Sequence, residues 1–185
     1  MNLWIRLLCL PLLAIAASMV SAQNVTEIST VQQLKDFRDA VNVGNSYAGQ
    51  TVKLTADLNL NGETWIPIGQ EGTNVANSNK FEGTFDGNGC VIANFVAQPH
   101  GSDLYATGFF GITQNATIKN VILKNATVTG HDKVGGVAGW DAGNTRFENC
   151  KVFDSNITAQ EMLINSSWSM GYPVGGIVEI GRAHV

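Results

Sequence analysis

Residues that could perform acid–base or metal chemistry are few and far apart in this chain. His100 and His131 lie in separate polar stretches, and neither has a second His, Cys or carboxylate at ligand spacing. Asp86 begins an Asp-Gly-Asn-Gly stretch that matches part of a calcium loop, but no bidentate Glu closes such a loop. We therefore expect solvated loop histidines, a turn at Asp86, and neither a metal nor a cofactor.

A second group of candidates comprises the carboxylates that could act as an acid–base pair on a sugar substrate. Such a pair requires two carboxyl groups gathered on one face of the fold. When the repeats described below are aligned, Glu148 matches Lys119 and Asp154 matches Asn125, so no column collects carboxylates. The chain also lacks a nucleophile elbow, a zinc signature and a phosphate loop. We assign no catalytic residue; the carboxylates considered are Asp132, Asp141, Glu148 and Asp154.

Aromatic side chains supply the best candidates for binding. Trp168 and Tyr172 lie among serines and asparagines in residues 159–173, which lengthen one repeat relative to its neighbours. Trp140 directly follows Gly139. Aromatic rings on loops of a rigid scaffold can stack on sugar rings, so a glycan or another surface molecule is the expected partner. The alternative is that these rings fold back over the apolar face of the repeats.

The composition narrows the class of partner further. The chain has 185 residues and a formal net charge of −4, without a cluster of Lys and Arg. Nucleic acids are bound mainly through cationic side chains, so we expect no nucleic-acid partner. Cys90 and Cys150 are too few for a disulfide framework, and neither belongs to a Cys-x-x-Cys pair.

Both ends of the chain are expected to lie outside the fold. Residues 1–22 contain one cation, an apolar run and the small-x-small ending Val20-Ser21-Ala22, a pattern typical of a secretory signal peptide. We expect export to the cell surface or the medium, with no membrane span after cleavage. Residues 179–185 resemble the translation of a sequencing adapter, so we expect Val178 to be the last native residue of an incomplete repeat array.

The elements that must position these side chains begin with a helix in residues 23–50. Thr30 and Gln33 have the spacing of a capping box, and Gly44 suits a left-handed helix end. One apolar face follows at helical spacing, formed by Val31, Leu34, Phe37 and Val41. A single amphipathic helix ahead of repeated strands indicates a cap over the exposed end of the stack.

Residues 51–178 are expected to form β-coils. Residues 52–60 alternate apolar and polar, as in a strand with one buried face. Apolar-x-Asn patterns then recur at Asn94, Asn120 and Asn149, 26 and 29 residues apart. The last two repeats continue in step, so we expect Leu123 to match Val152 and Val128 to match Ile157 at inward positions. We expect these three asparagines to form one hydrogen-bonded ladder. Gly111 and Gly139 are expected at another bend, where the backbone needs positive φ or a side chain has no room.

These motifs resemble bacterial surface proteins that carry GLUG motifs, and the resemblance covers most of residues 51–178. It implies a right-handed parallel β-helix, often adhesin-like and occasionally attached to a peptidase, without an agreed catalytic set. Phe109-Phe110 and Cys90-Val91 depart from the usual residues. The matching segments are Phe81-x-Gly-x-Phe85-Asp-Gly-Asn-Gly, Ile92-x-Asn94, Gly108-Phe-Phe-Gly111, Ile118-x-Asn120 and Gly135-Gly-Val-Ala-Gly139.

Three functions fit these observations. The favoured one is a secreted or cell-surface binding module, because the chain combines an export signal, repeats and no catalytic constellation. The second is the N-terminal part of a β-helical polysaccharide lyase or hydrolase. The third is the repeat region of a larger surface peptidase.

Overall fold

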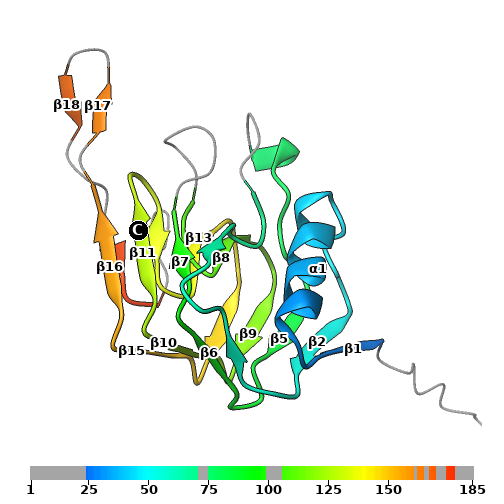
Figure 1. Ribbon diagram of the computed structural model, residues 1–185. Coiled ribbons are helices and arrows are strands. Elements are labelled where there is room, and N and C mark those ends of the chain that lie inside the picture. The colour runs from blue at the N-terminus through cyan, green and yellow to red at the C-terminus, as the bar shows by residue number, and fades with distance from the viewer. Residues whose placement is uncertain are drawn as a thin grey trace, which may run out of the picture.

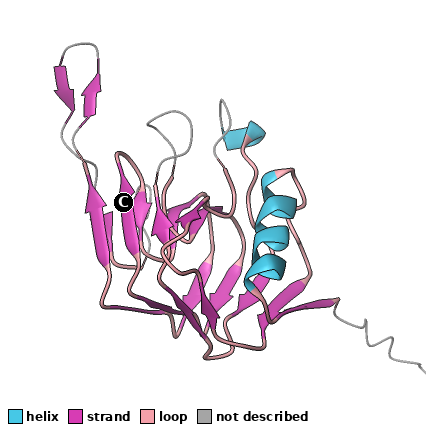
Figure 2. Cartoon of the chain, in the orientation of Figure 1, coloured by secondary structure: helices cyan, strands magenta, loops and turns pink. Residues whose placement is uncertain are grey.

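The computed structural model describes residues 24–70, 75–98, 106–160, 162–164, 167–169 and 174–177. This part of the chain is mainly β, with parallel sheets and one α-helix, α1 (Val31–Asn42), at one end (Figures 1 and 2). A single 3-10 turn, η1 (Val75–Asn77), follows the fourth strand. The expected signal peptide and the residues matching the adapter lie outside the described residues.

The largest sheet has five parallel strands in the order β1-β2-β5-β9-β14. Its central register aligns Val52, Phe85, Ile118 and Phe147, so each return of the chain places an apolar residue on the same inner column. The first three are fully buried. The strands are β1 (Val25–Ile28), β2 (Thr51–Leu54), β5 (Thr84–Asp86), β9 (Thr117–Lys119) and β14 (Arg146–Glu148).

Two further sheets have four parallel strands each, in the orders β3-β6-β10-β15 and β4-β7-β11-β16. The predicted pairing of Leu123 with Val152 and of Val128 with Ile157 is confirmed. The strands are β3 (Leu58–Asn59), β6 (Val91–Ala93), β10 (Ile122–Lys124), β15 (Lys151–Phe153), β4 (Thr64–Trp65), β7 (Val96–Ala97), β11 (Thr127–Gly130) and β16 (Asn156–Ala159).

Three strand pairs complete the fold. β8 (Phe110–Thr113) pairs with β13 (Ala138–Asp141), and β12 (Val134–Gly135) pairs with β19 (Val174–Gly175), both in parallel. β17 (Met162–Ile164) and β18 (Ser167–Ser169) form an antiparallel hairpin. That hairpin extends away from the end of β16 (Figure 1).

Gly111 and Gly139 lie inside β8 and β13, so their predicted placement at a bend is wrong. Neither has a positive φ. The other half of the expectation is confirmed, because a side chain has no room at either position. A Cβ at Gly111 would collide with the Gly69 carbonyl oxygen, and one at Gly139 would lie 2.5 Å from the Thr107 amide nitrogen.

Helix α1 forms as its sequence predicts. The Thr30 hydroxyl accepts a hydrogen bond from the Gln33 amide at 3.2 Å, and the Gln33 side chain accepts from the Thr30 amide at 3.1 Å. Gly44 follows the helix with φ of +108°. The buried face of the helix packs against residues in and just before β5 (Figure 1). The centroid of the Phe37 ring lies 5.5 Å from that of Phe81 and 5.8 Å from that of Phe85.

Aromatic rings fill the core between the helix and the sheets. Trp65 stacks on Phe109 with centroids 5.2 Å apart, and its indole N–H donates to the Phe109 carbonyl at 2.9 Å. The Arg38 guanidinium lies 5.0 Å from the Trp65 ring centroid. Burying a tryptophan without a partner for its N–H would be unfavourable, so this hydrogen bond fixes how Trp65 is oriented.

Asparagines occupy the corners between sheets, but they form two ladders. In one, Asn94 donates to Asn59 at 2.8 Å and accepts from Asn125. In the other, Asn149 donates to Asn120 at 3.0 Å. The predicted link from Asn94 to Asn120 is therefore wrong. Asn94, Asn120, Asn125 and Asn149 all have left-handed φ values between 51° and 59°, a conformation that asparagine tolerates better than most residues.

Candidate functional site

Trp140 is half-buried in β13 and has a cation against its ring. The Lys133 ammonium lies 4.7 Å from the Trp140 ring centroid. Lys133 also donates to Asp132 at 2.9 Å. One face of the indole is thus already in a cation–π contact, which leaves less of Trp140 for stacking on a sugar than its sequence position suggested.

The other two aromatic candidates lie in the lengthened repeat. Trp168 is in β18 and pairs with Leu163 across the β17–β18 hairpin. Tyr172 lies outside the described residues. Trp168 and Trp140 belong to different elements, β18 and β13.

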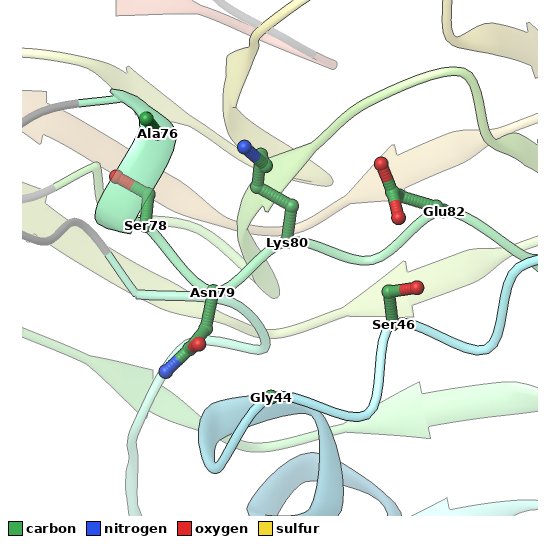
Figure 3. A pocket seen from close by; sticks show the side chains of 7 residues that line it. All are labelled: Gly44, Ser46, Ala76, Ser78, Asn79, Lys80 and Glu82. Atoms are coloured by element: carbon green, nitrogen blue, oxygen red, sulfur yellow. The ribbon is translucent and has the colours of Figure 1, made fainter.

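A polar cavity of about 300 Å³ lies beside the C-terminal end of α1. Figure 3 shows the Lys80 and Glu82 side chains extending from one side of the same stretch of chain, with Ser46 next to Glu82. The sequence pattern had not identified Lys80 or Glu82 as candidate residues. The complete lining is Gly44, Ser46, Ala76, Ser78, Asn79, Lys80 and Glu82.

The backbone around this cavity is held by hydrogen bonds between segments distant in sequence. The Asn79 side chain, which lines the cavity, donates to the Asn42 carbonyl at 2.6 Å, and this bond links the lining to the end of α1. The Glu82 amide donates to the Ser46 carbonyl at 2.8 Å. Ser78 is almost fully buried. The cavity is therefore part of the folded framework.

The lining of this cavity is polar. It offers an ammonium, a carboxylate, hydroxyls and an amide, which together donate and accept hydrogen bonds. Neither a cysteine nor a histidine is among the lining residues.

Two of the carboxylates considered from the sequence, Asp141 and Glu148, have local partners. Asp141 accepts from the Gly143 amide at 3.1 Å, and Glu148 pairs with Arg146. His131 is half-buried, with a buried Nδ1 that has no partner in the described part of the chain, so its expected solvation is wrong. His100 lies outside the described residues. Within the described ranges, no three His, Cys, Asp or Glu side chains form a group able to hold a metal.

Asp86 forms the turn that the sequence predicted. Its carboxylate accepts from the Asn88 amide and from the Asn120 side chain, both at 2.9 Å. Partial burial alone would raise the pKa of Asp86. The hydrogen bonds from Asn120 and Asn88, together with the positive charge of Lys119, outweigh that effect and hold the pKa below its ordinary value.

Both thiols are shielded and free. Cys90 and Cys150 are half-buried and form no disulfide. Burial raises the pKa of each thiol, with nearby Asp57 acting in the same direction at Cys90. A raised pKa lowers the thiolate fraction at neutral pH, which argues against a nucleophilic role for either cysteine.

Comparison with known proteins gives distant matches and no family. No family model matches the chain, and no solved structure matches it. Halomucin from Haloquadratum walsbyi is 28% identical over 125 residues, which is 63% of this chain and 1% of halomucin. A putative Gly-rich membrane protein from Evansella cellulosilytica is 31% identical over 109 residues, 58% of this chain and 12% of that protein. The chain thus spans only a small part of either relative.

No helix in the described part of the chain is both long enough and apolar enough to cross a bilayer.

Proposed function

We propose that this chain is a secreted or cell-surface repeat module, an adhesin-like right-handed parallel β-helix with GLUG motifs, that binds a glycan or another surface ligand. The observation that carries the proposal is the strand register. Successive returns of the chain add parallel strands to the same three sheets, with apolar residues on the inner columns. A stacked scaffold of this kind presents its loops and turns along one long surface.

The two relatives support an extended exported protein. One is named a halomucin and the other a putative Gly-rich membrane protein, and each is many times longer than the matching segment. The signal-peptide pattern of residues 1–22 points the same way.

We assign ligand binding first to the polar cavity beside α1. Its volume of about 300 Å³ is at the lower end for small-molecule sites, which suits one sugar unit. Lys80 and Glu82 flank the same side of the cavity and can hydrogen bond to neighbouring hydroxyls of a ring (Figure 3). Trp140 and Trp168 are secondary candidates.

A glycan-binding screen with the purified chain tests this assignment. The double variant Lys80→Ala/Glu82→Ala should bind the selected glycan about 5- to 150-fold more weakly, because two hydrogen-bonding side chains are removed, each contributing about 0.5–1.5 kcal/mol. Lys124→Ala, an exposed lysine in β10, is the matched control and should bind within twofold of the unaltered chain.

Two results would contradict the proposal. If no glycan binds, the ligand class is wrong. If the cavity variant binds normally while Trp140→Ala or Trp168→Ala loses affinity, the ligand instead contacts the aromatic residues.

A further inference from the structure

A second cavity lies between β1 and the N-terminal half of α1, where the chain passes from the first strand into the helix (Figure 1). Its volume is about 240 Å³, and its lining shares no residue with the polar cavity described above. Glu27 comes from β1, Asp36 and Phe37 come from α1, and Tyr47 comes from the loop after the helix. The two cavities can therefore be altered independently.

This cavity carries negative charge that no lining residue neutralises. Glu27 and Asp36 both line it, and neither a lysine nor an arginine is among the lining residues. The Glu27 carboxylate has no hydrogen-bond or ion-pair partner within the described ranges, although Lys53 is its neighbour across the β1–β2 pair. Asp36 accepts from the Gln32 side chain at 2.8 Å through one oxygen, so its second oxygen is available to a ligand.

Aromatic rings form the apolar part of the same cavity. The Phe37 and Tyr47 rings meet edge to face, with centroids 5.0 Å apart. The Tyr47 backbone is held in place, because its amide donates to the Asn45 side chain at 3.3 Å and its carbonyl accepts from the Gln50 amide at 2.9 Å. Burial raises the pKa of the Tyr47 phenol, so this side chain stays neutral at pH 7.

These features select one class of ligand. Carboxylates attract a cation, and the faces of aromatic rings attract cations that carry alkyl groups. A metal ion fits poorly, because Ca²⁺ requires a full shell of oxygen ligands and the described residues contain no group of three His, Cys, Asp or Glu able to hold a metal. The volume is below the range of about 300–1,000 Å³ usual for small-molecule sites, which restricts the ligand to a few carbon atoms around its charge.

We propose that this cavity binds a small organic ammonium ion, with its alkyl groups against Phe37 and Tyr47 and its charge beside Glu27 and Asp36. The site is separate from the glycan site proposed above, and it binds a ligand of different chemistry. Both carboxylates are exposed to solvent, so water screens their attraction and the affinity is expected to be modest.

Choline and its uncharged carbon analogue, in which a carbon atom replaces the nitrogen, test the proposal. The two molecules have nearly the same shape and differ in charge. Each is titrated into the isotopically labelled full chain, and amide shifts are followed by NMR. Choline should shift amides of residues 26–28 and of Tyr47, and it should bind about 5- to 30-fold more tightly than the analogue. Potassium chloride at the same concentration controls for ionic strength and should not produce these shifts.

Variants of the lining complete the test. Glu27→Gln should weaken choline binding by about 2- to 5-fold and leave the affinity for the analogue unchanged, because only a charge is removed. Tyr47→Leu keeps an apolar side chain but removes the ring, so it should weaken choline binding more than binding of the analogue. Glu148→Gln is the matched control, because Glu148 lies in the same register column as Glu27 but does not line the cavity.

Three results would overturn the proposal. The first is that choline leaves the cavity amides unshifted. The second is equal affinity for choline and its carbon analogue, which would show that the cavity does not recognise charge. The third is that Glu148→Gln weakens choline binding as much as Glu27→Gln does, since the effect would then come from the overall charge of the chain.

Discussion

Gly139 lies in β13 against the backbone of neighbouring strands, and replacing it with alanine tests how tightly they pack. The added Cβ would lie 2.5 Å from the Thr107 amide nitrogen and 2.8 Å from both the Ala106 carbonyl carbon and the Lys133 carbonyl oxygen. Ordinary contacts settle near ~3.5–4.0 Å, so these atoms must move by about 1 Å. Thr107 donates to Lys133 at 2.8 Å, and the movement stretches that hydrogen bond.

The expected loss of stability follows from these contacts. Overpacking of this kind costs about 1–3 kcal/mol, and weakening a backbone hydrogen bond adds about 0.5–1.5 kcal/mol. Alanine restricts the unfolded chain more than glycine, which offsets about 0.4–1 kcal/mol. We therefore expect Gly139→Ala to lower the free energy of unfolding by about 2–3 kcal/mol.

Urea unfolding followed by circular dichroism measures this difference. With a slope of about 1–3 kcal/mol per molar urea, the midpoint should fall by about 1–2 M. Gly176→Ala is the matched control, because a Cβ there would have no atom within 4 Å and the backbone is outside the left-handed region. If both variants have the same midpoint, steric crowding at Gly139 does not limit the fold.

Three further outcomes are expected. Trp65→Phe should lower the free energy of unfolding by about 0.5–1.5 kcal/mol in urea, because the Phe109 carbonyl loses the indole N–H and keeps only the Ile68 amide as a donor; an unchanged midpoint would contradict this. Asn120→Gly should be about 1 kcal/mol more stable than Asn120→Ala, because both lose the ladder but only alanine opposes a φ of 54°; equal stability would show that the corner is unstrained. Because the folded pKa of Asp86 lies below its unfolded value, the ionised carboxylate stabilises the fold above about pH 4, and this stabilisation is lost as pH falls through the folded pKa. Asp86→Asn should therefore show a shallower loss of stability between about pH 5 and pH 2 in thermal melts, and identical profiles would contradict the assignment.

Much of the local structure could be predicted because single residues determine it. The capping box at Thr30 needs only two side chains at a fixed spacing, and it forms as expected. The register between β10 and β15 followed from identical spacing in two neighbouring repeats.

The asparagine ladder shows where such reasoning failed. Each coil turns at more than one corner, and asparagine with positive φ occupies several of them. Asn94 and Asn120 both follow an apolar-x pattern, so spacing alone could not tell that they belong to different corners. The strand pairing decides it, because Ala93 aligns with Lys124 and places Asn94 beside Asn125.

The polar cavity could not have been found from spacing at all. Ser46 and Lys80 come from separate segments, and they meet only because Asn79 is bound to the end of α1. The signal available was weak, namely two opposite charges at Lys80 and Glu82 beside a polar loop. Likewise β1 is only four residues long, and its two polar residues, Thr26 and Glu27, are adjacent, so it showed no alternation to detect.

The corner hydrogen bonds have a kinetic consequence. They join side chains 29 to 35 residues apart, a nearly constant separation along the stack. Because the entropy of closing a loop changes only slowly with its length, every coil meets almost the same barrier when it closes onto the previous one. Since α1 and β1 come first in the chain, the helix-capped end can form during synthesis and serve as the template on which later coils fold in order.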